Sequence, residues 1–104
     1  MINDFMKPEL NQLQRKKAKQ LAHHLEPVVT VGLQGLTENV IKKTDECLLA
    51  HELIKVKFNS HKEKKRILIQ TLAESTESIM VDLIGNVGIL YRPNPEVKLR
   101  KISL

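Results

Sequence analysis

Two glycines, Gly32 and Gly35, enclose Leu33 and Gln34 in a G-x-x-G pattern. Glycine lets a backbone bend sharply and lets another chain approach closely, because it has no Cβ atom. Thr37 follows as an expected helix N-cap, and the amide groups at the start of a helix favour an anion. The spacing therefore predicts a loop suited to phosphate contact, although such a pattern also occurs in a simple tight connection.

A basic stretch precedes this loop and shows the apolar spacing of a helix over residues 10–25. Four leucines lie on one side of the expected helix, with Ala18 at its margin: Leu10, Leu13, Leu21 and Leu25. The other side carries Gln12, Lys16, Lys19, Gln20 and His23, with Arg15 and Lys17 flanking it. Since no acid interrupts positions 11–25, we expect this side to face phosphates, with a solvated helix face as the alternative.

The remaining patterns predict the elements that position these residues. Residues 28–31 and 53–58 read as strands, 37–51 as a helix, and 78–84 with 87–92 as a hairpin closed by a glycine turn. Ser60 and Glu63 match a capping box, so a third helix is expected to start there. Lys55 and Lys57 share one strand face, which indicates that helices cover only the opposite face of the sheet.

These elements predict an α/β fold with two layers in the order α-β-α-β-α-β-β. Its four-stranded mixed sheet has three strands in one direction and a last strand that returns antiparallel. The 104 residues make a single domain, with flexible ends expected at residues 1–8 and 94–104. The alternative for the second end is that Ile102 and Leu104 dock on the body of the domain.

Composition limits the classes of function. A net charge of +5 and a pI near 9.5 favour a polyanionic partner, and the lack of a long apolar segment argues for a cytoplasmic protein without membrane contact. Cys47 is the sole cysteine, so we expect a small core residue and no cysteine metal cluster. Neither paired carboxylates nor a nucleophile with an evident base is found, so we expect no enzymatic activity and no cofactor.

Several blocks in fixed order carry a family resemblance: A-H-x-L from Ala22, P-V-V-x-V-G-x-x-G-L-T-E from Pro27, H-E-L-I-K-V-K from His51, Ile84-Gly85, L-Y-R-P from Leu90, and the closing R-K-I-S-L from Arg100. On these blocks the chain resembles the YhbY-like RNA-binding proteins, whose fold is called the CRM domain. The resemblance implies a fold similar to the C-terminal domain of translation initiation factor three. It also implies RNA binding and, for stand-alone bacterial members, association with the precursor of the large ribosomal subunit.

The resemblance places the family's loop on the G-x-x-G pattern and its basic helix face on Lys16 and Lys19. We therefore expect a monomer that binds ribosomal RNA through Arg15, Lys16, Lys19, His23, Gly32, Leu33, Gln34, Gly35, Thr37, Lys42 and Lys43. Because aromatic residues make up only 3% of the chain, RNA shape is expected to matter more than base stacking. The alternative is a module that docks on a ribosomal protein or assembly factor without touching RNA.

Overall fold

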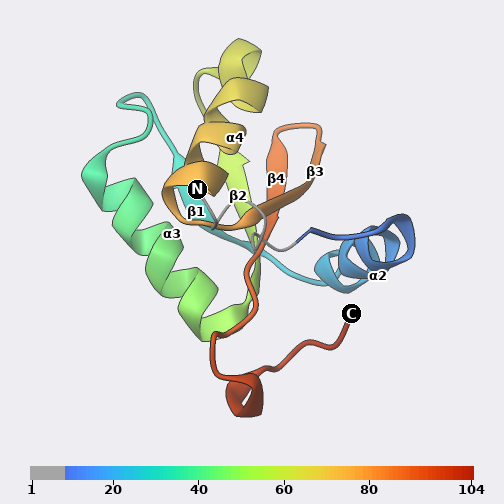
Figure 1. Cartoon of the computed structure of the whole chain (residues 1–104). Helices are drawn as coiled ribbons and strands as arrows, with labels where there is room; N and C mark the ends of the chain where they lie inside the picture. The colour runs from blue at the N-terminus through green and yellow to red at the C-terminus, as the bar shows by residue number, and fades with distance from the viewer. Residues whose placement is uncertain (1–8) are drawn as a thin grey trace.

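The computed structural model describes residues 9–104. The elements are α2 (Gln12–Ala22), β1 (Pro27–Val31), α3 (Glu38–His51), β2 (Leu53–Phe58), α4 (Lys65–Ser75), β3 (Ile79–Ile84) and β4 (Val87–Tyr91) (Figure 1). Two single-turn 3-10 helices lie at Lys62–Lys64 and Val97–Leu99. This order confirms the predicted α-β-α-β-α-β-β arrangement. The flexible end expected at residues 1–8 lies outside the described residues.

One four-stranded mixed sheet forms the centre of the fold, with the strands in the order β1-β2-β4-β3. Strand β1 pairs with β2 in parallel, and β4 pairs antiparallel with both β2 and β3. The first three strands therefore share one direction, as predicted. The hairpin turn contains Gly85 at φ +58, a left-handed conformation that glycine adopts without strain. The new finding is that the last strand lies between β2 and β3.

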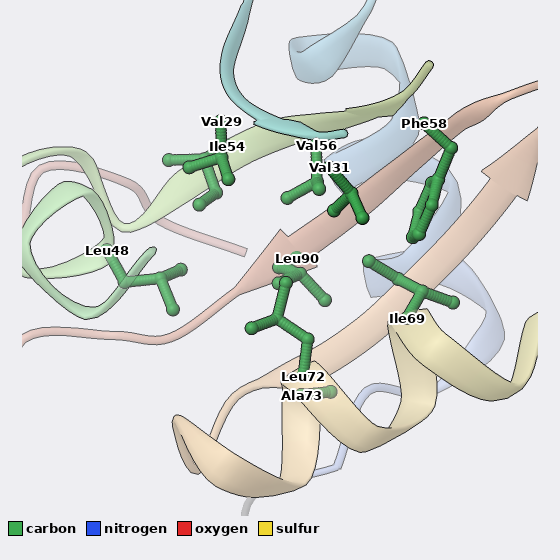
Figure 2. Close-up of a cluster of buried hydrophobic side chains, with 10 residues drawn as sticks. All are labelled: Val29, Val31, Leu48, Ile54, Val56, Phe58, Ile69, Leu72, Ala73 and Leu90. Carbon is green, nitrogen blue, oxygen red and sulfur yellow. The ribbon is translucent and has the colours of Figure 1, made fainter. Parts of the chain in front are cut away.

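Helices α3 and α4 cover one face of this sheet and enclose the larger hydrophobic cluster (Figure 2). Ile54, Val56 and Phe58 project from β2 into it, which confirms the predicted alternation of that strand. Their partners are Val29, Val31, Leu48, Ile69, Leu72, Ala73 and Leu90. Each fully buried aliphatic or aromatic side chain contributes roughly 1.5–3 kcal/mol. Cys47 is half-buried and packs against the same cluster, so it lies at the margin of the core in which it was predicted.

Helix α2 packs on the opposite face of the sheet, where the sequence predicted no helix. Ala18 and Ala22 are both 0% exposed and form a second cluster with residues of β2, β3 and β4: Leu53, Ile79, Val81, Ile89 and Tyr91. The two-layer expectation is therefore corrected to three layers, with α2 covering part of the second face. Lys57 is exposed and Lys55 half-buried on the part of this face that α2 leaves open.

Three of the four leucines predicted to form the buried side of this helix are instead exposed, whereas Leu10 packs against the second cluster as predicted. Leu13 is 76% exposed, Leu21 41% and Leu25 36%. The helix turns its alanines to the sheet, because side chains that end at Cβ let a helix backbone approach a sheet closely. Asn11 is the N-cap of α2, and its side chain and that of Gln14 form a reciprocal capping box.

The buried carboxylate of Glu52 holds the C-terminal segment against the body. Its Oε2 atom accepts from the amide of Asn94 at 2.6 Å, and Oε1 accepts from those of Lys101 at 2.7 Å and Ile102 at 2.9 Å. Burial raises the pKa of Glu52, but the three hydrogen bonds and the charge of Arg100 together outweigh this effect, so the pKa lies below its ordinary value. Ile102 and Leu104 pack on the second cluster, so the flexible end expected at residues 94–104 is corrected to a docked segment.

The start of α4 also differs from the prediction. Ser60 and Glu63 form no capping box, because the chain passes through His61 in a left-handed conformation at φ +57 and then through the 3-10 turn. Helix α4 begins only at Lys65, and no side chain caps it. The segment before α4 is therefore held by contacts other than a helix cap.

Candidate nucleic-acid interface

The glycine loop, residues 32–35, connects β1 to α3 as the sequence predicted. The amide of Gly35 donates to the carbonyl of Gly32 at 3.0 Å and closes a tight turn. Thr37 is the N-cap of α3, and its hydroxyl accepts from the amide of Val40 at 3.2 Å. Leu33 is 85% exposed at the tip of the turn. The loop therefore presents its backbone and an aliphatic side chain to solvent.

The two glycines of the loop have different structural roles. Gly35 has φ +73, so the turn itself requires a residue that tolerates the left-handed region. Gly32 lies outside that region, and a Cβ atom added there would have no atom within 4 Å. The amides of Leu33, Gln34 and Leu36 donate to no other residue within 9–104. Open space at Gly32 and these available amides would suit the close approach of an anionic backbone.

The basic side of α2 and Ile84 of the hairpin line an open hollow of about 590 Å³. The α2 residues that line it are Gln12, Arg15, Lys16, Lys19, Gln20 and His23. Two of its cations have partners inside the protein. Nη1 of Arg15 donates to the carbonyls of Met80 and Val81, and Nζ of Lys19 lies 3.4 Å from Oδ2 of Asp82. Lys16 and His23 are exposed and form no ion pair with a described residue.

The open part of the sheet connects α2 to the glycine loop. Lys55 lines a hollow of about 370 Å³ together with Lys19 and His23 of α2. Lys57 lies two residues further along β2 on the same face and pairs with Thr30 of β1. Thr30 is followed directly by Val31 and the loop. A row of cations thus extends from α2 across β2 toward the glycine loop.

Comparison with known proteins gives the family. The model of the CRS1 / YhbY (CRM) domain matches residues 10–92. The chain belongs to the CRM domain family. It is 41% identical over 92 residues to an RNA-binding protein of Haemophilus influenzae, covering 88% of this chain and 93% of that protein. It is 40% identical over 88 residues to a Pseudomonas aeruginosa protein named a probable RNA-binding protein, covering 84% of this chain and 85% of that one.

The fold of this CRM domain also matches a solved structure. The solution structure of a hypothetical protein from Staphylococcus aureus aligns with a TM-score of 0.75 and 34% sequence identity. The alignment covers 91% of this chain and 100% of that chain. The predicted YhbY-like family and the predicted α/β class with a mixed sheet are therefore both confirmed.

Two of the predicted site residues of this CRM domain lie on the opposite side of the sheet from the basic side of α2. Lys42 and Lys43 are exposed on α3, which packs on the opposite face of the sheet from α2. The structure therefore does not bring them together with Lys16 and Lys19.

The segment before α4 contacts the glycine loop. Nε2 of His61 is 2.7 Å from the carbonyl oxygen of Leu33. His61 is followed by the run Lys62-Glu63-Lys64-Lys65-Arg66, which sequence reasoning left outside the site. That run of four cations around one acid was the signal that could have placed the segment in the site.

Within residues 9–104, no His, Cys, Asp and Glu side chains gather in a group able to hold a metal ion. None of the helices described there has the length and apolar character needed to cross a membrane.

Proposed function

We propose that this protein binds RNA through a surface that runs from the basic side of α2, across Lys55 and Lys57, to the glycine loop. The observation that carries the proposal is the open approach to Gly32. A backbone without Cβ, beside amides that have no partner among the described residues, leaves room for a phosphate group. Cations along the route would neutralise neighbouring phosphates.

The names of the relatives support the same class of ligand. The Haemophilus influenzae protein is named as RNA-binding, and the alignment covers nearly all of both chains. Tyr91 is 7% exposed and Phe58 is buried, so neither offers a ring for base stacking. Contacts with the RNA backbone would therefore supply most of the affinity, and RNA shape would supply the specificity.

The finer proposal is that the RNA is ribosomal. The protein would act in the cytoplasm as a monomer, bind large-subunit ribosomal RNA or its precursor, and assist assembly of the subunit without catalysing a reaction. A small basic domain that reads RNA shape suits such a role, because folded ribosomal RNA offers many distinct backbone surfaces.

The test is a set of transcripts that together cover large-subunit ribosomal RNA, titrated with the protein at several salt concentrations. We expect binding to one or a few transcripts and a linear fall of log affinity with log salt. Sedimentation of the protein with large-subunit precursor particles would support the assembly role. Binding that is independent of salt, or that requires a ribosomal protein, would contradict the proposal.

One observation favours the second candidate, docking on a protein. An open cleft of about 420 Å³ lies between the C-terminal parts of α2 and α3, lined chiefly by apolar residues: Leu21, Leu25, Glu26, Val28, His51, Leu53, Ile54, Lys101 and Ile102. An apolar cleft of this kind could receive an aliphatic side chain of a ribosomal protein or assembly factor. It lies beside His51 and Lys101, at the end of β2 opposite the glycine loop, so the two functions would use different surfaces.

A further inference from the structure

Three connections meet at one edge of the sheet, which we call the loop edge: the glycine loop, residues 59–64 and the hairpin turn at 85–86. Main-chain hydrogen bonds join them where β2 ends. The amide of Phe58 donates to the carbonyl of Asn86 at 2.8 Å, and that of Asn59 to the carbonyl of Val31 at 3.0 Å.

Side chains fix the same arrangement. Nζ of Lys65 donates to Oδ1 of Asn86 at 3.1 Å, which attaches the start of α4 to the hairpin turn. His61 contacts the carbonyl of Leu33 and attaches the glycine loop to the 3-10 turn. With Nε2 at that distance from a carbonyl oxygen, the imidazole must donate through Nε2. The loop edge is thus held at four points.

The loop edge carries exposed cations that have no partner among residues 9–104. Lys57, Lys62, Lys64 and Arg66 are exposed, and none of them forms an ion pair there. Glu63 is the single acid between positions 57 and 66. On α2, by contrast, Arg15 and Lys19 already have partners on β3, which leaves fewer free charges for a ligand.

Two of these cations, Lys62 and Lys64, are placed unfavourably for the fold. Positive side chains near the start of a helix oppose its macrodipole by roughly 0.3–1 kcal/mol each. Lys62 and Lys64 precede α4 directly, and no side chain caps that helix. Clustered charges of one sign also repel one another, and a single acid offsets little of this. Their placement is unfavourable for the isolated protein, and an anionic partner would remove the penalty.

We propose that the loop edge, with Lys57, Lys62, Lys64 and Arg66, makes more of the phosphate contacts to RNA than the basic side of α2 does. The inference rests on the proposed function and assigns its principal electrostatic surface. One RNA backbone segment passes Gly32 and continues over the 3-10 turn to the first turn of α4. His61 is a positioning residue here, because it holds the Leu33 carbonyl and therefore the loop.

The experiment compares three double variants that remove the same charge. Lys62→Gln with Lys64→Gln alters the loop edge, and Lys16→Gln with Lys19→Gln alters α2. Lys98→Gln with Arg100→Gln is the matched control, since both residues are exposed in the C-terminal segment and belong to neither the loop edge nor α2. Each is titrated with the tightest-binding ribosomal transcript at several salt concentrations. A melt followed by circular dichroism checks the fold of each protein.

We expect the loop-edge double to lower affinity about tenfold or more at low salt and to reduce the salt slope by roughly 1.4–1.8, or 0.7–0.9 for each lost phosphate contact. The α2 double should lose less, and the control should keep the wild-type slope. Lys62→Arg with Lys64→Arg retains the charge and should bind like wild type. This conservative pair also shows whether any loss in the glutamine pair reflects charge.

Two outcomes would overturn the inference while leaving RNA binding intact. One is equal losses in the loop-edge and control doubles, which would mean that only net charge matters. The other is a larger loss in the α2 double than in the loop-edge double. If wild-type protein binds no transcript with a salt-dependent affinity, the proposed function fails first, and the inference fails with it.

Discussion

The guanidinium of Arg15 donates to the carbonyl oxygen of Val81 at 2.6 Å. A second hydrogen bond reaches the carbonyl of Met80 at 3.0 Å, so one side chain binds two successive carbonyls at the irregular outer edge of β3. This contact joins α2 to the sheet edge and also satisfies carbonyl groups that have no neighbouring strand.

Arg15→Ala should therefore reduce stability more than RNA affinity. Loss of two charge-assisted hydrogen bonds is expected to lower the free energy of unfolding by about 2–4 kcal/mol. Lys16→Ala, one position along, should leave stability within about 0.5 kcal/mol, because its side chain is exposed. Urea unfolding of both variants measures the difference. Equal stabilities would contradict a structural role for Arg15.

The two glycines of the loop should respond differently to alanine. Gly32→Ala is expected to fold with wild-type stability and to bind RNA more weakly, because the added methyl group enters open space where the RNA backbone would approach. Gly35→Ala should lower stability by roughly 1–2 kcal/mol, because φ +73 is strained for alanine. Thermal melts and RNA titrations of the two proteins separate these effects. A Gly32→Ala protein with unchanged affinity would remove the main support for phosphate contact at the loop.

Glu52 should make the domain sensitive to acid. Because folding lowers the pKa of Glu52 below its ordinary value of 4.5, its ionised form stabilises the fold above that value. This stabilisation is lost as the pH falls through the lower pKa of the folded state. Glu52→Gln should lower the free energy of unfolding by about 2 kcal/mol at pH 7. Urea unfolding from pH 7 to pH 3 should show the gap to wild type narrowing as the pH falls.

Glu96→Gln is the control for that series. The side chain of Glu96 is exposed, and its carboxylate accepts no hydrogen bond from a described residue. Its stability should follow wild type at each pH. A gap between Glu52→Gln and wild type that stays constant from pH 7 to pH 3 would mean that the charge of Glu52 does not hold the tail.

Gly88 in β4 should not tolerate a side chain. A Cβ atom added there would lie 2.6 Å from Cδ1 and 2.7 Å from Cγ1 of Ile69 in α4. Gly88→Ala is expected to lower the free energy of unfolding by about 1–3 kcal/mol through overpacking. Ile69→Ala removes both atoms, so the double variant should be less destabilised than the sum of the two single variants. A strictly additive double-mutant cycle would show that the two residues do not clash.

Local patterns were sufficient to predict the order of elements, the hairpin and the glycine loop. Ile54, Val56 and Phe58 occupy every second position, and a period of two places all three side chains on one face of a strand. The site residues that follow from local chemistry, such as Gly35 and Thr37, were therefore placed in the right elements. Their role in binding RNA stays a prediction.

The features that were not predicted depend on tertiary packing. Helix α2 carries both a leucine stripe and a pair of alanines, and periodicity alone does not say which of them meets the sheet. In the structure Ala18 and Ala22 are the residues that pack against the sheet, and α2 therefore forms a third layer of the fold. The docking of Ile102 and Leu104 was offered only as an alternative, because the tail is held by Glu52, more than 40 residues distant from Asn94 in sequence. The proximity of His61 to Leu33 likewise arises only once β1 and β2 have paired.

The position of β4 has a consequence for synthesis of the chain on the ribosome. Strand β4 emerges after the other three strands, yet it lies between β2 and β3. Until β4 emerges, β1 and β2 of a nascent chain can pair with each other, but β3 has no partner strand. Both β2 and β3 then have an unpaired edge that is open to other chains. The sheet can therefore close only late in translation, and a ribosome that stalls before Val87 would display a fragment prone to aggregation.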